Sequence, residues 1–247
     1  MLGRCETIED MFIIGDFDPK QIRADQQAEM VTRSMNEVAR EREFLDQELH
    51  DSSTVIGSLN VRSLRKHFED VLTDPFIMKC DIFGLCETWL HKGEEPIFPN
   101  FNGIYVNSGR GKGIAVFTKE PLDYEVLKLD DASAVFVKHE ELDVIFVYLS
   151  QNFEWHPVRE FFDNVIRPKK PTVIMGDVNW HYSDDHPMKD YLQSRVFTQL
   201  ITRATHKEGR CIDHLYASRD FGEEEITLKQ QSVPYSDHDL ITAFVPK

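Results

Sequence analysis

The chain has 247 residues, of which 41% are hydrophobic and 29% are charged. A chain of this length and composition can bury a large core, which excludes disorder throughout. No apolar run reaches the roughly 18 residues of a membrane-spanning helix, and the first residues lack the pattern of a signal peptide. The four cysteines include no C-x-x-C pair, which favours buried thiols and a reducing compartment. We therefore expect an intracellular protein with no membrane partner.

The formal net charge of −15 is unfavourable for a partner that carries phosphates, because phosphate-binding proteins usually have an excess of lysine and arginine. Residues 1–50 carry 6 basic and 12 acidic side chains, leaving 22 and 31 for residues 51–247. The first segment is therefore the more acidic per residue. Some acids of the second segment are candidates for a metal site, where a bound cation would offset their charge.

Residues 1–50 differ in kind from the rest of the chain. The stretch 21–49 is polar and helix-prone, and its apolar residues have a heptad-like spacing. These residues are Val31, Met35, Val38, Leu45 and Leu49. The pattern predicts an amphipathic helix that packs on a neighbouring domain or, as the sharper alternative, a coiled coil. We place the domain boundary after residue 50, which gives an N-terminal helical appendage over 1–50 and a domain over 51–247.

From Thr54 onward, strand-like apolar runs alternate with helical patterns and turn signals, as in a layered α/β domain. Helices are expected over 61–72, 157–166 and 188–203. Strands are expected over 54–59, 81–86, 103–106, 113–118, 124–129, 134–138, 143–149, 172–176, 211–217 and 239–245. The middle strands follow one another closely, which predicts hairpins or a meander.

Five short motifs lie at the ends of predicted strands. They are SLN (58–60), CETWL (86–90), MGDVN (175–179), IDHLY (212–216) and SDHDLI (236–241). Each motif alone is weak evidence, because an aspartate after a strand is commonly a turn or helix-capping residue. Strand ends in α/β folds meet at one edge of a sheet, where functional sites usually form. The five motifs together therefore predict one shared site.

In this order, with Tyr148 at a strand end between the second and third motifs, residues 54–247 resemble the endonuclease/exonuclease/phosphatase superfamily. The resemblance implies an α/β fold, namely a four-layer sandwich of two mixed β-sheets flanked by helices. It also implies a hydrolase of phosphodiester bonds with Mg²⁺ as cofactor, for which Mn²⁺ is a possible substitute. The alternation of strands and helices is compatible with this fold but would not identify it.

The resemblance assigns catalytic roles to five residues. Asp177 is the base that takes the proton of the attacking water, and Asn179 holds that aspartate or the phosphate in position. His238 contacts the phosphate, while Asp213 orients this histidine and keeps it protonated. Tyr148 is a phosphate-contacting tyrosine, although this chain lacks the proline of the usual Tyr-x-Pro string.

For the metal, the resemblance assigns Glu87 as the leading ligand, joined by Asp237, with Asn60 as a supporting amide. So few protein ligands leave room for water and substrate oxygens, which Mg²⁺ prefers. Arg62 stands where many apurinic-type members have an acid or an amide. It is predicted to contact a phosphate or, equally, to be a surface arginine at a helix start.

The strings LNVRSL, ETWL and RGKGIAVF resemble the apurinic-type endonuclease domains of non-LTR retrotransposons and Helitron-like elements, which nick DNA. Arg110 and Lys112 of the last string are then substrate-binding cations, although a hairpin turn is a sufficient explanation for this segment. The stretch 2–19 resembles the C-terminal end of a Pif-family DNA helicase. The implied partners are DNA and a helicase domain or subunit, and the implied location is the nucleus.

Two alternatives stay open. One is a phosphatase that acts on a small or lipid phosphoester, since the superfamily uses one metal site for both reactions, although IDHLY fits the DNA branch better. The other is an inactive transposon remnant or a binding module. In either case His181, His186 and His206, which lie in polar stretches, are interpreted as surface residues.

Overall fold

A computed structural model describes residues 47–221 and 226–247. The chain divides into two units, Met1–Glu48 and Leu49–Lys247, and the second is described below. The helicase-like stretch and almost all of the expected N-terminal helix lie outside the described residues. Their interpretations therefore stay predictions.

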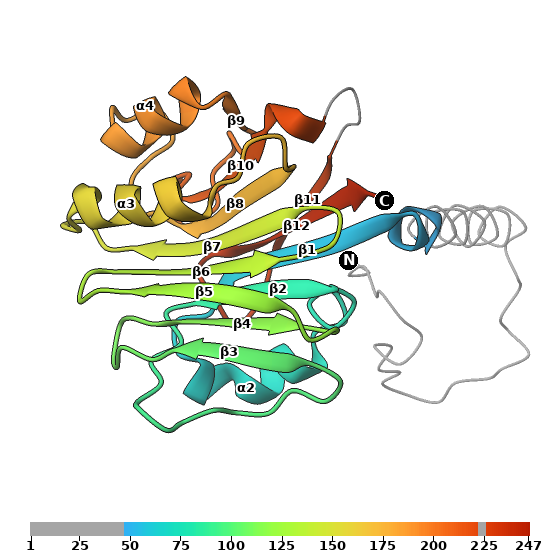
Figure 1. Cartoon of the computed structure of the whole chain (residues 1–247). Helices are drawn as coiled ribbons and strands as arrows, with labels where there is room; N and C mark the ends of the chain where they lie inside the picture. Colours follow the sequence, from blue (N-terminus) through green and yellow to red (C-terminus); the bar gives the residue numbers. More distant parts are fainter. Residues whose placement is uncertain (1–46, 222–225) are drawn as a thin grey trace, which may run out of the picture. The chain divides into compact units, whose positions relative to one another are not determined.

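The described strands form two six-stranded sheets (Figure 1). The first sheet has the order β11 (Thr227–Ser232), β12 (Asp239–Pro246), β1 (Ser53–Asn60), β2 (Ile82–Cys86), β4 (Ile114–Thr118) and β3 (Asn102–Val106). The second has the order β5 (Asp123–Lys128), β6 (Ala132–Lys138), β7 (Asp143–Leu149), β8 (Thr172–Asp177), β10 (Asp213–Ser218) and β9 (Phe197–Gln199). The pairs β1–β2 and β7–β8 are parallel and the others antiparallel, so both sheets are mixed.

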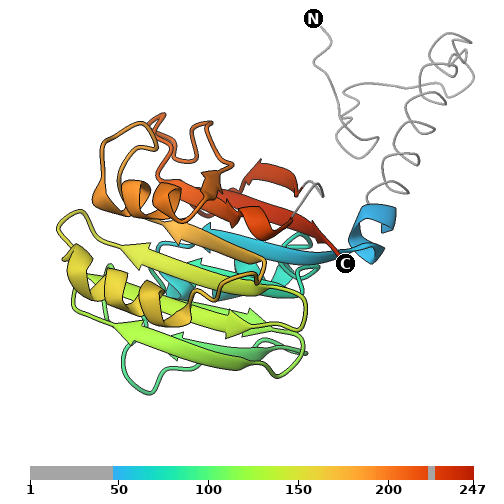
Figure 2. The same cartoon turned by 45° about the horizontal axis from the view of Figure 1, so that its top comes forward.

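Helices cover the outer faces of the two sheets (Figures 1 and 2). Helix α2 (Leu64–Thr73) packs on the first sheet, and α3 (Trp155–Val165) and α4 (Pro187–Ser194) pack on the second. A short 3-10 helix, η3 (Arg219–Phe221), follows β10. Among the described residues, no helix is both long and apolar enough to span a membrane.

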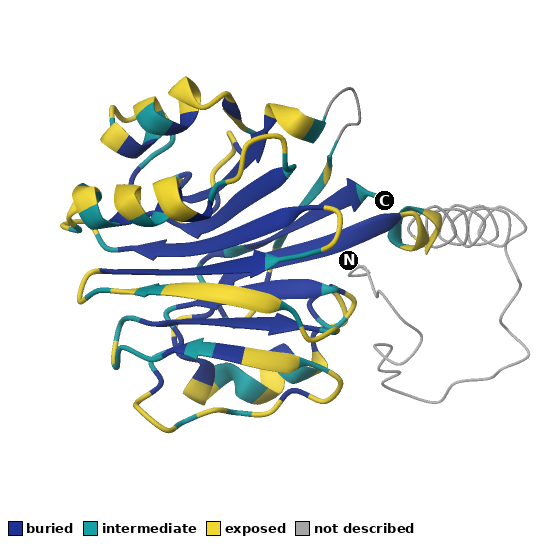
Figure 3. Cartoon of the chain, viewed as in Figure 1, coloured by how far each residue is buried: buried dark blue, intermediate teal, exposed yellow. Residues whose placement is uncertain are grey.

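The main core lies between the sheets, because each strand sends alternate side chains inward. Ile56 and Val116 of the first sheet share this core with Val144 and Phe146 of the second. The central strands are buried, whereas the edge strand β5 is largely exposed (Figure 3). The predicted four-layer sandwich of two mixed sheets flanked by helices is therefore confirmed.

The first predicted helix begins later than its sequence pattern indicates. Arg62 and Ser63 have φ angles of 45° and 98°, which interrupt a regular helix. The Ser63 hydroxyl then accepts a hydrogen bond from the Lys66 N–H at 3.3 Å and caps α2. The loop that leaves β1 is thus held in an unusual conformation before the helix starts.

The predicted helix over 188–203 is wrong in its second half. Helix α4 ends at Ser194, and residues 197–199 form β9 beside β10. Strand β11 was also missed, because its sequence TLKQQS has no alternation of apolar and polar residues. Both strands lie at sheet edges, where tertiary pairing decides the conformation more than local pattern does.

The sheet topology brings several strand ends together. The parallel strands β1 and β2 pair Asn60 with Cys86, directly before Glu87. The parallel strands β7 and β8 place Tyr148 beside Asp177. Strands β1 and β8 contact each other across the sandwich. Polar residues at the carboxyl ends of four strands therefore meet at one edge.

Gly176, directly before Asp177, occupies a position that only glycine fits. Its φ angle is +141°, and a Cβ atom built on it would lie 2.0 Å from the carbonyl oxygen of Val147 in the neighbouring strand. Gly209 also has a positive φ, +80°, but a Cβ there meets nothing within 4 Å. Substitution of Gly209 therefore tests the cost of the positive φ angle alone, whereas substitution of Gly176 adds the cost of a steric clash.

We expect Gly176→Ala to lower the free energy of unfolding by about 3 kcal/mol or more, because backbone atoms cannot yield to the added methyl group. The control Gly209→Ala should cost only about 1 kcal/mol. Urea unfolding followed by circular dichroism measures both values. Equal losses in the two variants would contradict the assigned clash with Val147.

Candidate active site

The centre of the site is an amide that joins two carboxylates. Asn60, at the end of β1, is 1% exposed, and its Nδ2 donates to Glu87 Oε1 at 3.0 Å and to Asp177 Oδ2 at 2.8 Å. The Asn60 Oδ1 accepts a hydrogen bond from the Arg62 backbone N–H at 3.0 Å. A carboxylate accepts hydrogen bonds but cannot donate them. The amide NH2 group of Asn60 donates to both acids and so offsets the repulsion between them.

Asp177 is held by three further features of its loop. Its Oδ1 accepts the Asn179 backbone N–H at 2.9 Å, and its Oδ2 accepts Asn179 Nδ2 at 3.2 Å. The Asn179 Nδ2 also donates to the Leu149 carbonyl at 3.0 Å, which fixes the amide between β7 and β8. Asn179 therefore orients Asp177, which is one of the two roles that the sequence predicts for it.

The environment of Asp177 makes this carboxylate unusually basic. Burial raises its pKa to about 8, with the negative charge of Asp213 acting in the same direction. The charge of His238 and the hydrogen bond from Asn60 oppose this increase. A carboxylate with a pKa near the working pH is suited to accept a proton.

His238 and Asp213 form a buried pair on the other side of the site. His238 Nδ1 lies 2.8 Å from Asp213 Oδ2, and each side chain is 5% exposed. Burial alone would lower the pKa of His238, but the charge of Asp213 and its hydrogen bond raise it to about 9. A pKa this high favours the protonated imidazole at neutral pH, and the predicted contact of His238 with a phosphate stays a prediction.

Asp237 faces Arg62 and His206 instead of Glu87. The Arg62 guanidinium pairs with Asp237 Oδ2, and His206 Nε2 lies 3.3 Å from the same oxygen. Although partial burial raises the pKa of Asp237, the bond and charge of Arg62 lower it below the ordinary value. Arg62 thus has a structural partner, and its predicted phosphate contact stays a prediction.

His206 is not the surface residue that its polar surroundings indicate. Its ring lies 4.7 Å from that of His238, and it forms a backbone bridge with the same residue. Hydrogen bonds from Lys207 N to Asp237 O and from Asp239 N to Thr205 O fix this pairing. No local motif signals this position, because it depends on pairing between segments about 30 residues apart. His181 and His186 are likewise half-buried.

A loop between β3 and β4 closes the site beside Glu87. Tyr148 is 6% exposed and donates its hydroxyl hydrogen to the Gly111 carbonyl at 2.9 Å. Burial, with the charges of Glu87 and Asp177, raises the Tyr148 pKa, so the phenol stays protonated. The indole Nε1 of Trp89, which the sequence interpretation did not single out, donates to Glu87 Oε2 at 3.2 Å.

The two predicted substrate-binding cations of this loop have intramolecular contacts. The Arg110 guanidinium lies 5.7 Å from the centre of the Trp89 ring. Lys112 Nζ donates to the Asp130 carbonyl at 2.7 Å and lies 3.1 Å from the Asp131 carboxylate. Both cations therefore stand beside the site, and their contact with a substrate stays a prediction.

The loops of the site concentrate unusual backbone angles. Eight non-glycine residues of the described chain have positive φ, and five of them belong to these loops: Arg62, Ser63, Glu87, Trp89 and Asn179. Such conformations cost free energy and persist where the surrounding structure enforces them. The site side chains are therefore held in place before any ligand binds.

The donor set fits a hard divalent cation. Glu87 and Asp177 point at one amide, and Asp213 places a further negative charge near Asp177, which a cation would offset. Within the described residues, two further groups gather three ligand side chains, namely Asp177, Asp213 and His238, and His206, Asp237 and His238. Glu87 and Asp237 belong to no common group, so their joint role as ligands stays a prediction.

Residues 57–238 match the Endonuclease/Exonuclease/phosphatase family, and the chain belongs to this family. Its members hydrolyse phosphoester bonds and generally depend on a divalent metal ion. A comparison with curated proteins finds no match.

Solved structures share the fold. An AP endonuclease from Archaeoglobus fulgidus has a TM-score of 0.64 and 17% identity, covering 76% of this chain and 98% of that chain. The endonuclease domain of TRAS1, a telomere-specific non-LTR retrotransposon, has a TM-score of 0.54 and 14% identity, covering 78% and 98%. The 3′ phosphatase NExo from Neisseria, bound to a product DNA hairpin, has a TM-score of 0.54 and 17% identity, covering 77% and 98%. These identities establish similarity of fold alone.

In metal-free protein, we expect the imidazole of His238 to titrate with a pKa of about 9. Asp213→Asn should lower this pKa toward or below the ordinary value of about 6.5, because the neighbouring negative charge is lost. Histidine ring chemical shifts measured by NMR against pH report both values. Asp239→Asn is the control, since that carboxylate bonds Gln230 and Ser232. Titration of wild-type His238 near 6.5 would contradict the charged pair.

Proposed function

We propose that the protein is a Mg²⁺-dependent DNA endonuclease that nicks the phosphodiester backbone. One arrangement carries the proposal. The amide NH2 group of Asn60 joins Glu87 and Asp177. The pair of His238 and Asp213 lies next to Asp177. A base and a cationic donor thus share one site. Cleavage of a phosphodiester needs both, because water must lose a proton while charge develops on the phosphate oxygens.

Asp177 accepts the proton of the attacking water in this proposal. The hydrogen bonds from Asn60 and Asn179 fix the orientation of the carboxylate. Its remaining lone pairs therefore accept a hydrogen bond from water in a fixed direction. Its raised pKa makes it a stronger base than an exposed aspartate. The general-base contribution to the rate is about 10²- to 10⁴-fold.

His238 stabilises the charge that develops on the phosphate. Asp213 accepts a hydrogen bond from Nδ1–H of His238. The Nε2–H of the protonated ring can therefore donate to a phosphate oxygen. Tyr148 adds a neutral hydroxyl donor once a phosphate oxygen replaces the Gly111 carbonyl. His238 is in place before reaction and needs little reorganisation, whereas Tyr148 must first release the Gly111 carbonyl.

The cation would be held by Glu87 first, with Asn60 and Asp237 completing the set that we propose. Mg²⁺ supplies Lewis-acid stabilisation of the phosphate oxygens, and Mn²⁺ is a possible substitute. Glu87 is already aimed by Asn60 and Trp89. Asp237 is engaged by Arg62 and His206, which makes it the weaker candidate.

The choice of DNA as substrate rests on the retrotransposon-like strings and is supported by the titles of two similar structures, a retrotransposon endonuclease and a phosphatase bound to DNA. The helicase-like stretch 2–19 adds a second reason and suggests a linked helicase domain or subunit and a nuclear location. Since the chain carries a net charge of −15, we propose weak, salt-dependent DNA binding, with the linked helicase supplying much of the affinity.

The second candidate is a phosphatase of small or lipid phosphoesters, favoured by the phosphatase among the similar structures. The same base and cationic donor would serve that reaction. The third is an inactive remnant. Side-by-side assays of supercoiled plasmid, a soluble inositol phosphate and buffer alone, each with Mg²⁺, separate the three. Nicking of the plasmid without release of phosphate from the inositol compound is the outcome that we expect.

Asp177→Asn should lower the nicking rate at least about 100-fold, because an amide cannot accept the proton of water. Conversion of supercoiled to open-circular plasmid measures the rate. Asp190→Asn removes an exposed aspartate of α4 and should leave it unchanged. If Asp177→Asn nicked at the wild-type rate, the assignment of the base would be wrong.

Glu87→Gln should raise the Mg²⁺ concentration that gives half-maximal nicking by about tenfold or more, because one negative ligand becomes neutral. Saturating Mg²⁺ should restore part of the rate, which separates a ligand from a base. Glu120→Gln, an exposed acid after β4, provides the matched control. An unchanged Mg²⁺ requirement would remove Glu87 from the metal site.

A further inference from the structure

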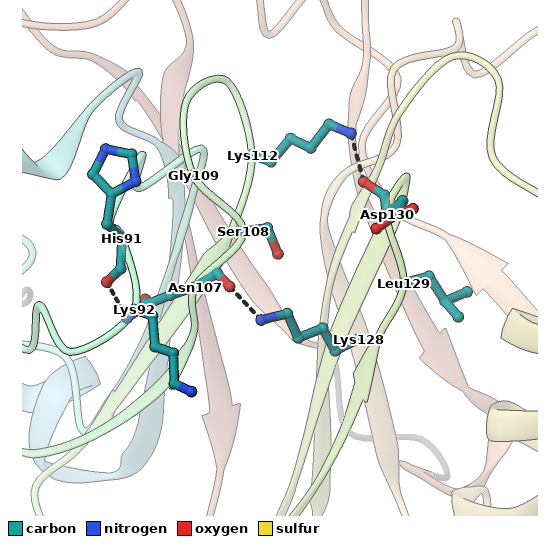
Figure 4. A pocket seen from close by; sticks show the side chains of 9 residues that line it. All are labelled: His91, Lys92, Asn107, Ser108, Gly109, Lys112, Lys128, Leu129 and Asp130. Atoms are coloured by element: carbon teal, nitrogen blue, oxygen red, sulfur yellow. Dashed lines mark hydrogen bonds between the residues drawn. The ribbon is translucent and has the colours of Figure 1, made fainter.

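A polar pocket lies on the far side of the β3–β4 loop from Glu87. Its volume is about 530 Å³, and Figure 4 shows it between that loop and the turn that joins β5 to β6. The lining residues are His91, Lys92, Asn107, Ser108, Gly109, Lys112, Lys128, Leu129 and Asp130. The pocket therefore spans the edges of both sheets.

The lining is positively charged although the chain is acidic. Three lysines and one aspartate line the pocket, which gives a local charge of +2 from these four side chains. Lys112 reaches across to the Asp130 carbonyl at 2.7 Å, and Lys128 reaches back to the Asn107 carbonyl at 2.6 Å (Figure 4). An ammonium has three donors, so both lysines retain N–H groups for a ligand.

Three further groups of the pocket have no hydrogen-bond partner within the part of the chain that the structure describes. Lys92 is exposed and, among the described residues, makes no hydrogen bond or ion pair. Ser108 Oγ and Asn107 Oδ1 are buried atoms without a hydrogen-bond partner. A buried polar atom in this state costs about 1–3 kcal/mol, and an acceptor such as a phosphate oxygen would recover this cost for the Ser108 hydroxyl. A structural clamp between the sheets would explain Lys112 and Lys128 but not Lys92 or the Ser108 hydroxyl.

The pocket is tied to the site by its shared loop. The Gly111 carbonyl accepts from Tyr148 on the side of the site, and the Lys112 carbonyl accepts the Trp89 N–H at 3.1 Å. The Gly109 N–H donates to the Leu90 carbonyl at 3.1 Å, next to His91. One short loop therefore both contacts the segment that follows Glu87 and lines the pocket, which makes the pocket a neighbour of the site.

We propose that this pocket binds a phosphate of the DNA backbone that neighbours the cleaved one, with Lys92, Lys128 and the Ser108 hydroxyl as donors. The inference rests on the proposed endonuclease function and gives it a second contact with the substrate. The pocket contributes affinity and register, whereas Asp177 and His238 perform the reaction. It supplies local cations in a chain whose total charge opposes DNA binding.

The test measures DNA affinity without cleavage. Fluorescence anisotropy of a labelled duplex in EDTA gives Kd against NaCl concentration for wild type, Lys92→Gln and Lys128→Gln. Each substitution should raise Kd about three- to tenfold at low salt and reduce the slope of log Kd against log salt by about 0.9. Lys79→Gln is the control, since this exposed lysine precedes β2, at the opposite end of that strand from Glu87.

Unchanged Kd and salt slope in Lys92→Gln would overturn the proposal, and so would an equal loss in Lys79→Gln. Thermal unfolding of Lys128→Gln shows whether its loss of affinity comes from unfolding, and Lys92, which has no partner, is free of that ambiguity. Absence of nicking in wild type, with affinity still dependent on Lys92, would refute the proposed function and leave the phosphate pocket standing.

Discussion

The hydrogen bonds of the Asn60 amide connect the two sheets of this domain. Asn60 ends a strand of the first sheet, whereas Asp177 ends a strand of the second, so its 2.8 Å bond crosses the sandwich. The bond between His238 and Asp213 also joins the segment before β12 to a strand of the second sheet. Because each pair draws one partner from each sheet, the site exists only when the sheets are packed in register.

The same arrangement determines the charge balance of the site. The site brings together four acids, and Arg62 and His238 place positive charge among them. The four acids are Glu87, Asp177, Asp213 and Asp237. Burial, together with the negative charge of Asp213, raises the pKa of Asp177, which weakens folding but makes the carboxylate a better base. Arg62 neutralises Asp237, so the negative charge available to a cation is concentrated near Glu87 and Asp177.

The sequence predicts the layers and the gathering of motifs well, because alternating apolar runs and strand-end acids are local signals. It cannot predict contacts that depend on register. Asp237 is drawn toward His206 by backbone pairing between two loops, and neither residue type signals that pairing. The same holds for β9, where pairing with β10 overrides a helical pattern. The catalytic roles of the site residues are proposals that require measurements of activity.

The net negative charge of the chain opposes binding of its proposed substrate, DNA, but this repulsion weakens with distance from the phosphate. At physiological ionic strength the Debye length is about 8 Å, so a bound phosphate interacts mainly with the groups that surround it. Those groups include the four acids of the site as well as His238, and the proposed cation and the lysines across the β3–β4 loop would offset these acids. The distant charge still opposes the approach of a polyanion, because long-range repulsion acts on the encounter. The proposed nuclease would therefore gain most from the proposed partner that brings DNA to its site.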